Sequence, residues 1–308
     1  MKVAIGVLTY KRPDGLKRLL AGLELLTFEK ACTPEVHVLV IDNDPEASAQ
    51  DFCLQRQESY RWKLVYSQET RRGISHARNR ALALGADGYD GIAFIDDDEE
   101  PAPDWLDQLL FVQQEYGADV VTGPVLPRME EPAPDWSKKG KFYERSRHPT
   151  GFRMELARTG NVLISTSLLK NPTNRFDPRY GLSGGEDTHF FLRIRQQGHE
   201  IIWADEAVVY EWVPASRIKP GWLLQRAYRS GNTYALCERD IRLPAHRLLL
   251  RAVKGVMRIG WGMLLLLPSV LLGPVRLIRS LQQICIGAGM VMGLAGSRYE
   301  EYEETHGV

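Results

Sequence analysis

The stretch of sequence that decides the fold is Gly91-Ile92-Ala93-Phe94-Ile95-Asp96-Asp97-Asp98-Glu99-Glu100. Its apolar half is short enough to be a strand that is buried on both faces of a sheet. Carboxylates follow at once, and ligands of open α/β sheets bind at the carboxyl ends of the strands. Because adjacent aspartates repel one another, a divalent cation held by their oxygens would stabilise the cluster. The alternative is a solvated acidic turn, the commoner role of an isolated Asp-x-Asp sequence.

Strands and helices alternate along the first two thirds of the chain, which predicts a mostly parallel, doubly wound α/β sheet. The expected strands lie at 3–9, 36–41, 64–67, 92–95, 120–122, 160–165 and 200–209. Helical spacing of apolar residues is clearest at Leu16, Leu19, Leu20 and Leu23. Further helices are expected near 71–84, near 103–111, and after Asp187, with Phe190, Phe191 and Ile194 facing inward. Residues 127–158 show little periodicity and are expected to form a long loop able to close over a ligand.

Composition indicates an ordinary globular protein, with 44% apolar and 25% charged residues in a chain of 308. The formal net charge is zero but unevenly spread, because residues 217–299 carry thirteen Lys or Arg against Glu238 and Asp240, a net charge of +11. The length favours two domains, which we place at 1–215 and 216–308. The basic arm predicts a negatively charged surface as its partner.

The C-terminal arm combines cations with long apolar runs. Residues 246–263 are expected to be helical, with a basic stripe formed by Arg247, Arg251, Lys254 and Arg258. Two uncharged runs follow, at 259–275 and 280–297. We favour a basic interfacial helix followed by a shallow re-entrant hairpin. Two membrane spans would break the positive-inside rule at Arg276 and Arg279, and a soluble helical subdomain is the remaining alternative.

Two further features bear on the compartment. Four widely separated cysteines form no metal-ligand spacing and are typical of a reducing compartment. The apolar run at the start of the chain is too short for a signal peptide. We therefore expect the cytosolic side of the membrane.

Several short motifs follow one another in a specific order. They are Thr9-Tyr10-Lys11-Arg12, Asp42-Asn43-Asp44, Ala77-Arg78-Asn79, Asp96-Asp97-Asp98 and Gly184-Gly185-Glu186-Asp187. This ordered set resembles the family 2 glycosyltransferases with the GT-A fold, and is similar to bacterial exopolysaccharide enzymes of the succinoglycan glucosyltransferase type. The resemblance covers residues 1–212 well and the C-terminal arm only loosely.

The resemblance implies a donor site in the first half of the chain. Asp42 would hydrogen-bond the uracil edge, although a turn or helix N-cap is the usual role of such a residue. Thr9 and Arg12 would line the nucleotide, with a plain surface cation as the alternative for Arg12. Asp96 would contact the ribose and share a Mn²⁺ or Mg²⁺ ion with Asp98, the metal ligand. For Asp97 the resemblance leaves two roles open, contact with the ribose and ligation of the metal ion.

Arg78 and the Gly-Gly-Glu-Asp motif complete the site that the resemblance implies. Arg78 would add positive charge near the phosphates, or form an ion pair on a helix surface. Asp187 would be the catalytic base that accepts the proton of the acceptor hydroxyl. Glu186 would orient the acceptor or raise the pKa of Asp187. The alternative is two acids that stabilise the first turn of a helix, with Gly184 and Gly185 allowing close approach of the backbone.

One departure from the family pattern separates this chain from processive members, which carry Gln-x-x-Arg-Trp beyond the base. Here the sequence around Gln225 reads Gln-Arg-Ala-Tyr-Arg-Ser-Gly. We therefore expect one sugar to be transferred per encounter. Arg226 and Arg229 remain available for a diphosphate, of either the donor or a lipid carrier.

These features together predict a membrane-associated, metal-dependent, inverting glycosyltransferase. Its donor would be a nucleotide-sugar, with a UDP-sugar such as UDP-glucose favoured, and its acceptor a polyprenyl-diphosphate-linked glycan. It would act at the cytoplasmic face of the inner (plasma) membrane, peripheral or re-entrant through residues 246–297, without a nucleic-acid partner. A catalytically inactive nucleotide-sugar-binding scaffold is one alternative, and it predicts loss of residues such as Asp98 or Asp187. A phosphatase with an Asp-x-Asp nucleophile, or a nucleotidyltransferase, is the other.

Overall fold

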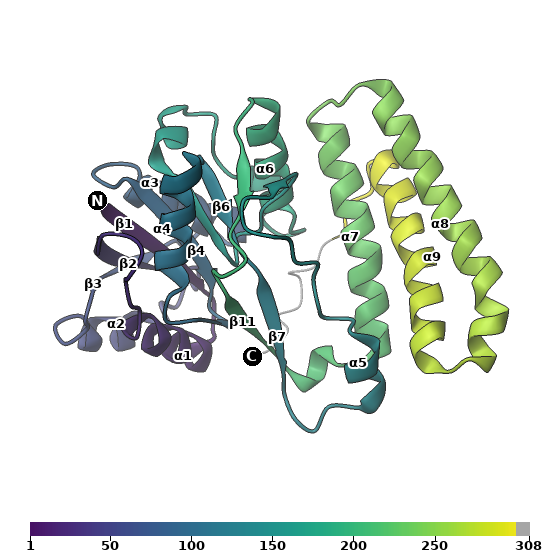
Figure 1. Cartoon of the computed structure of the whole chain (residues 1–308), viewed down its shortest axis with the longest axis horizontal. Coiled ribbons are helices and arrows are strands. Elements are labelled where there is room, and N and C mark those ends of the chain that lie inside the picture. The colour runs from purple at the N-terminus through teal and green to yellow at the C-terminus, as the bar shows by residue number, and fades with distance from the viewer. Residues whose placement is uncertain (300–308) are drawn as a thin grey trace.

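The computed structural model describes residues 1–299 of the chain. Within that range an eight-stranded sheet forms the centre of the molecule, in the order β3-β2-β1-β4-β9-β6-β10-β8 (Figure 1). Its strands are β1 (Lys2–Thr9), β2 (Glu35–Asp42), β3 (Lys63–Gln68), β4 (Gly91–Asp96), β6 (Val120–Thr122), β8 (Arg153–Met154), β9 (Val162–Ser165) and β10 (Ile201–Trp203). Among these strands, β8 and β9 run antiparallel to their neighbours and the other pairings are parallel. The predicted mostly parallel α/β sheet is confirmed.

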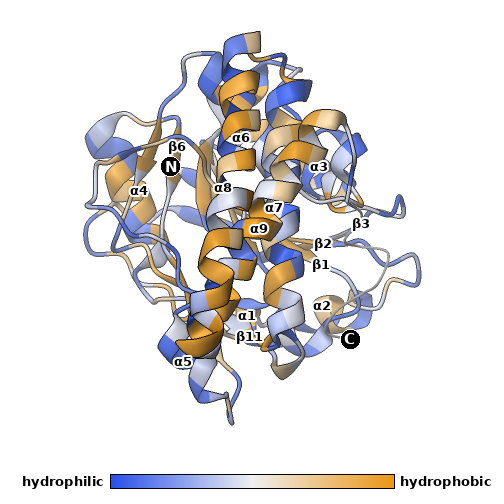
Figure 2. Ribbon diagram, turned by 90° about the vertical axis from the view of Figure 1, so that its right-hand side faces the viewer, coloured by the Kyte–Doolittle hydropathy of each residue, from blue (hydrophilic) through white to orange (hydrophobic). Residues whose placement is uncertain are grey.

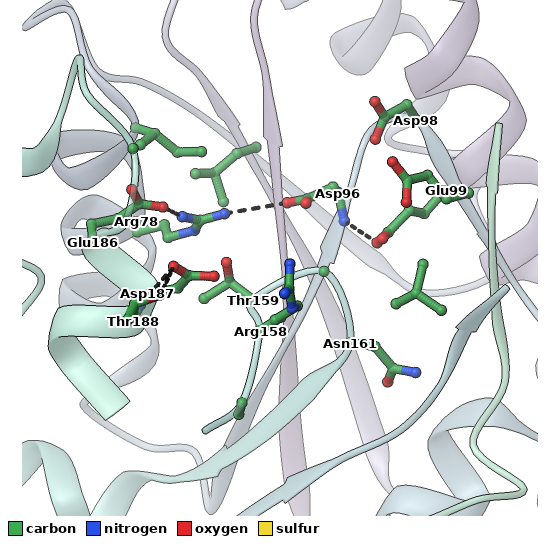
Figure 3. Close-up of a pocket in the computed structure, with 18 of the residues that line it drawn as sticks. Arg78, Asp96, Asp98, Glu99, Arg158, Thr159, Asn161, Glu186, Asp187 and Thr188 are labelled. Atoms are coloured by element: carbon green, nitrogen blue, oxygen red, sulfur yellow. Dashed lines mark hydrogen bonds and ion pairs between the residues drawn. The ribbon is translucent and has the colours of Figure 1, made fainter. Parts of the chain in front are cut away.

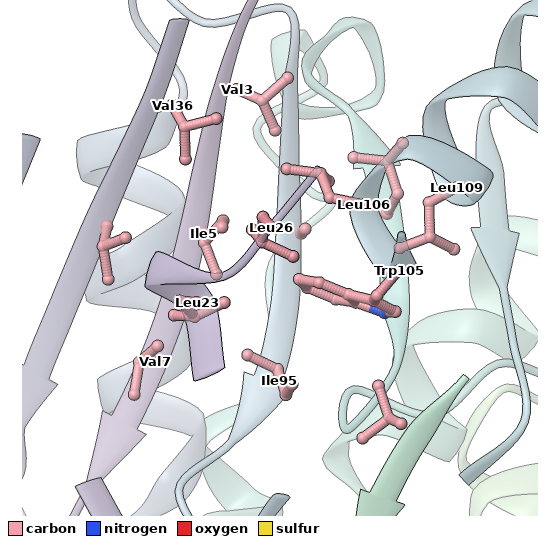
Figure 4. Packing of buried hydrophobic residues seen from close by; sticks show 14 of the residues in the cluster. Val3, Ile5, Val7, Leu23, Leu26, Val36, Ile95, Trp105, Leu106 and Leu109 are labelled. Carbon is pink, nitrogen blue, oxygen red and sulfur yellow. The ribbon is translucent and has the colours of Figure 1, made fainter. Parts of the chain in front are cut away.

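Helices cover both faces of this sheet. They are α1 (Pro13–Glu24), α2 (Gln50–Arg56), α3 (Ile74–Gly85), α4 (Trp105–Tyr116) and α6 (Glu186–Gln196), with single turns η1 (Thr166–Lys170) and η2 (Pro178–Tyr180). On one face, α1 and α4 pack against β1 and β4 around Leu23, Ile95 and Trp105 (Figure 4). The leucines predicted to face inward from α1 are all fully buried.

The opposite face is covered by α3 and α6. Phe94 of β4 packs here against Phe176, which stacks on Phe190 of α6 with ring centroids 4.5 Å apart. Phe190, Phe191 and Ile194 are fully buried, as their spacing predicted. Because both faces are covered, β4 is the doubly buried strand that its unbroken apolar run predicted.

A second sheet of three strands holds the residues that follow β4. It consists of β5 (Glu99–Pro101), β11 (Val209–Val213) and β7 (Val125–Met129), in the order β5-β11-β7. Its register places Glu211 opposite Glu99, and the Trp212 amide donates to the Asp98 carbonyl at 2.9 Å. The single strand expected at 200–209 is therefore wrong, since its two ends belong to different sheets. The predicted long loop also contains β7, β8 and a short helix, α5 (Asp135–Gly140).

The C-terminal arm consists of three long helices, α7 (Pro220–Asp240), α8 (Ala245–Leu271) and α9 (Pro274–Ala295), after a single turn η3 (Ala215–Arg217). Helix α9 packs between α7 and α8 (Figure 1). Glycines make the close approach possible. The Ile286 carbonyl of α9 occupies the space of a side chain at Gly231 of α7, and a Cβ atom at Gly255 of α8 would lie 3.1 Å from the Gly287 carbonyl oxygen. Helix α7 also contacts α6, so it joins the arm to the first domain.

Helix α8 extends eight residues beyond the boundary predicted at Met263, and it passes through Pro268 without a break. The basic stripe and the first apolar run therefore belong to one helix, which corrects the expected separation of an interfacial helix from a re-entrant hairpin. Both α8 and α9 are long and apolar enough to cross a membrane by length and composition. Figure 2 shows that hydrophobic residues predominate along much of α8. The apolar face of α8 consists of Leu249, Leu250, Val253, Val256, Met257, Trp261, Met263, Leu264, Leu267, Val270 and Leu271, all exposed.

Candidate active site

A cleft of about 640 Å³ opens at the carboxyl ends of β1 and β4. Asp96, Asp97 and Asp98 line one part of it, and Glu186 and Asp187 at the start of α6 line another (Figure 3). The two acidic groups that the sequence predicted to share a site are therefore brought together by the fold.

Asp97 is the most enclosed member of the aspartate cluster. The Thr9 hydroxyl donates to its carboxylate at 2.9 Å and Arg12 donates at 3.0 Å. Burial raises the pKa of Asp97 to about 7, against the opposing effect of the Arg12 charge. The Asp97 carbonyl also occupies the space that a side chain at Gly15 would need, so α1 can lie against this turn only with glycine there. Thr9 and Arg12 thus hold the cluster from the first strand.

Asp96 and Asp98 present their carboxylates to the cleft, with 39% and 22% of their side chains exposed. Arg12 and Arg217 approach one oxygen of Asp98 at 3.1 and 3.4 Å. Arg78 approaches Asp96 at 3.4 Å. Burial raises the pKa of Asp96 despite Arg78, and the Asp98 charge adds to that rise. These two carboxylates are the accessible oxygen ligands of the cluster.

No group of three or more His, Cys, Asp or Glu side chains in residues 1–299 is arranged to hold a metal ion. Two accessible carboxylates nevertheless fit the coordination that Mg²⁺ prefers, in which one or two protein carboxylates are completed by substrate phosphates and water. The donor set of Asp96 and Asp98 therefore suits a metal that arrives with a phosphorylated ligand. It does not suit a permanently bound structural ion.

Glu186 is buried and forms an ion pair with Arg78 of α3. The pair is interior, which corrects the helix-surface pair considered for Arg78. The second Glu186 oxygen has no hydrogen-bond partner within the described chain. Asp187, the next residue, accepts hydrogen bonds at Oδ1 from the amide and hydroxyl of Thr188. Gly184 and Gly185 both have positive φ and lead into α6, so the motif needs glycine at these positions.

The structure does not place Asp42 on the wall of the cleft. Asp42 is fully buried, and its carboxylate accepts hydrogen bonds from the amides of Asp44 and Ala49 and from the Tyr66 hydroxyl. These contacts are those of the turn residue considered as its alternative, and they contradict a direct contact with a base in this conformation. Asn43 lines the cleft instead.

Several residues of this cleft carry little local sequence signal and were not predicted. Glu99, Glu211, Arg145, Arg158 and Arg217 all line it. Burial, together with the Asp96 and Asp98 charges, raises the pKa of Glu99 well above its usual range. Pairing of β5 with β11 brings Glu211 here, where Arg145 and Arg217 approach it at 2.9 and 3.6 Å. The signal that was missed is the short strand β11, whose glutamate stands among apolar and aromatic residues.

Comparison with known protein families and curated relatives gives consistent matches. A sequence profile described as Glycosyl transferase family 2 matches residues 4–171. The chain is 33% identical over 237 residues to the succinoglycan biosynthesis protein ExoM of Rhizobium meliloti, covering 76% of this chain and 74% of ExoM. It is 21% identical over 230 residues to the glycosyltransferase AglE of Haloferax volcanii, covering 75% and 72% of the two chains.

Solved structures with the same fold are GT-A glycosyltransferases. The mannosyltransferase PcManGT of Pyrobaculum calidifontis, in complex with GDP-Man and Mn²⁺, has a TM-score of 0.66 at 19% identity, and the match covers 96% of this chain and 88% of that one. Residues 1–349 of S. aureus TarS, in complex with UDP, have a TM-score of 0.52 at 17% identity, with 97% and 93% covered. The predicted GT-A fold is confirmed.

Proposed function

Because the chain belongs to glycosyl transferase family 2 and is related to ExoM, we propose that it transfers a single sugar to a lipid-linked glycan during exopolysaccharide biosynthesis. The donor is a nucleotide-sugar, with UDP-glucose as the first to test. The acceptor is a glycan on a polyprenyl diphosphate. Transfer inverts the anomeric centre, so that an α-linked donor gives a β-glycoside.

The observation that carries this proposal is that Asp98 and Asp187 line a single cleft (Figure 3). A direct displacement needs positive charge at the departing diphosphate and a base at the attacking hydroxyl. The two acidic groups lie on different elements, β4 and α6, and face one space large enough for a donor and an acceptor. A nucleotide-binding scaffold would have no need of the second group.

The aspartate cluster acts on the donor side of the reaction. Asp96 and Asp98 would hold a Mn²⁺ or Mg²⁺ ion, which supplies Lewis-acid stabilisation of the leaving diphosphate. Arg12 and Arg217, both within 3.4 Å of Asp98, hold that carboxylate in place from two directions. Asp97 is held by Thr9 and Arg12 and acts as a positioning residue.

Asp187 acts on the acceptor side of the reaction. Its Oδ1 is held by Thr188, which leaves Oδ2 to accept the proton of the acceptor hydroxyl as the new bond forms. Glu186 is less suited to that role, because its ion pair with Arg78 stabilises its charged form and holds it in place. Arg78 thereby acts on catalysis indirectly, by fixing the start of α6.

The experiment that tests this function is a donor screen with membrane extract as acceptor. UDP-glucose, UDP-GlcNAc and GDP-mannose are supplied in turn to the wild type, to Asp187→Asn and to the matched surface variant Asp51→Asn. We expect transfer from one donor, a loss on the order of 10²- to 10⁴-fold in Asp187→Asn, and wild-type rates in Asp51→Asn. Equal rates in the wild type and Asp187→Asn would exclude the assigned base, and no transfer from any donor would favour a scaffold.

The arm supports a peripheral position at the cytoplasmic face of the inner (plasma) membrane. Helix α9 is covered by α7 on one side and by α8 on the other, and α7 carries Arg226 and Arg229 on the cleft. A bilayer crossing would take these cations into hydrocarbon at high cost. We propose instead that α8 lies in the plane of the membrane surface with its apolar face inserted. Of the basic stripe, Arg247 and Lys254 are exposed, and Arg251 pairs with Glu238 at 2.6 Å.

A further inference from the structure

Helix α7 forms a wall between the cleft and the membrane-facing helices. Trp222, Arg226, Arg229 and Thr233 line the cleft from one face of this helix, at the spacing of residues that share a helical face. The other face of α7 packs on α9, where the Tyr228 carbonyl occupies the space of a side chain at Gly289. An acceptor that reaches Asp187 from the membrane would therefore pass along α7.

Four arginines gather on this side of the cleft. Arg226 and Arg229 come from α7, Arg158 from the loop before β9, and Arg145 from the loop after α5. Burial, together with the neighbouring charges of Arg145, Arg158 and Arg229, lowers the pKa of Arg226 to about 10. Mutual repulsion of this kind raises the free energy of the protein alone, so an anion bound among these side chains would be stabilised.

Among residues 1–299, carboxylates offset only part of the charge of Arg145, Arg158 and Arg226. Glu211 pairs with Arg145 at 2.9 Å, but it also pairs with Arg217 of the donor side. Arg158 is exposed to the cleft and has no carboxylate within ion-pair distance in residues 1–299. Figure 3 shows Arg158 projecting into the space between Asp187 and Asp96. Arginines bind phosphate oxygens in a bidentate manner, so the guanidinium groups of Arg158 and Arg226 suit a phosphate anion.

We propose that Arg158 and Arg226, with Arg145 and Arg229, form a metal-independent diphosphate subsite, and that it holds the carrier-linked diphosphate of the acceptor. The inference rests on the proposed function and names the part of the acceptor that the cleft binds. The donor diphosphate has its own place at Asp96 and Asp98. The α7 arginines lie instead on the side where a membrane-borne acceptor enters.

The position of the base fits an acceptor bound in this way. Thr233 of α7 fills the space that a side chain at Gly185 would need, so this part of α7 lies against the start of α6 and Asp187. Arg226 precedes Thr233 by seven residues, which is about 10 Å along a helix. That span leaves room for sugar between the reacting hydroxyl and the diphosphate.

The test measures binding without transfer. Geranyl diphosphate is titrated calorimetrically into the full chain in detergent, with EDTA present to exclude metal-dependent binding at Asp98. We expect binding that weakens about tenfold or more in Arg158→Gln and in Arg226→Gln, that partly recovers in Arg226→Lys, and that is unchanged in Asp98→Asn. Lys254→Gln, which removes an exposed cation of α8, is the matched charge control, and geraniol is the control for the chain.

The outcomes distinguish the carrier-linked diphosphate of the acceptor from the diphosphate of the donor. Unchanged affinity in both arginine variants overturns the subsite, and so does displacement of the probe by UDP in EDTA, which would assign these arginines to the donor. Arginine-dependent binding by a protein that transfers no sugar would leave the subsite standing while the proposed function fails. In active protein, the KM for the diphosphate-linked acceptor rises in Arg226→Gln while the donor KM stays constant. Thermal unfolding of each variant checks that it is folded.

Discussion

Arg78 on α3 and Glu186 on α6 form a buried ion pair between residues that stand 108 positions apart in the sequence. Their side chains are 3% and 4% exposed. The same guanidinium reaches Asp96 at 3.4 Å. One side chain therefore joins the end of β4, where the aspartate cluster begins, to the helix that carries Asp187. Because the two acidic groups meet through this contact, the site depends on a residue that lies mostly out of reach of the substrate.

Removing one member of this pair leaves the other charged and buried. Arg78→Met and Glu186→Leu are each expected to lower the free energy of unfolding by about 3–5 kcal/mol, whereas the double variant Arg78→Met/Glu186→Leu loses less than the sum of the single changes. Urea unfolding of the four proteins measures the coupling. Additive losses, or single losses below about 1 kcal/mol, would show that the pair does not stabilise the junction.

Metal removal separates the two sides of the cleft. EDTA is expected to abolish transfer by the wild type and Mn²⁺ or Mg²⁺ to restore it, because the leaving diphosphate needs a Lewis acid. Asp98→Asn should need a higher metal concentration for half-maximal rate, since one carboxylate ligand is lost. Initial rates against metal concentration measure this, with Asp51→Asn as the matched surface control. Transfer that proceeds unchanged in EDTA would contradict the role given to Asp98.

Local sequence patterns predicted most of the central sheet. Unbroken apolar runs located β1, β2 and β4, and the spacing of Leu16 to Leu23 located the buried face of α1. These features are visible because strand and helix periods are properties of short segments. The same patterns placed the aspartates at a strand end and the Glu-Asp pair at a helix start.

Contacts between distant segments were beyond the reach of local patterns. Asp42 ends a strand, as a nucleotide-binding residue would, yet its oxygens bond to Asp44, Ala49 and Tyr66. Glu211 joins the cleft because β11 pairs with the three-residue β5, a strand too short to have a period of its own. Helix α8 is longer than predicted and continues through a proline, Pro268. The missing hydrogen bond and ring clash of a proline usually end a helix.

The apolar face of α8 gives a direct prediction about membrane binding. Leu264→Glu is expected to lower partition onto vesicles that contain anionic lipid by about tenfold or more. The change removes an apolar side chain that would be buried in the bilayer, and it adds a charge that the lipid repels. Leu25→Glu, at the end of α1, is the matched control, since Leu25 is 65% exposed and Leu264 is 67% exposed. Sedimentation with vesicles measures the bound fraction, and equal loss in both variants would exclude α8 as the docking face.

The buried side chain of His189 should make the free energy of unfolding depend on pH. This side chain is buried against Tyr180, with ring centroids 4.9 Å apart, and burial lowers its pKa to about 4, from about 6.5 in the unfolded chain. Between these values the unfolded state binds a proton that the folded state does not. Stability is therefore complete above about pH 6.5 and falls as the pH drops toward 4, by about 3 kcal/mol. His189→Phe keeps the ring stacking and removes the titration, so its free energy of unfolding should change less between pH 7 and pH 4.5 than that of the wild type. His246→Asn, an exposed change on α8, should keep the wild-type slope; if His189→Phe keeps it too, the acid sensitivity has another source.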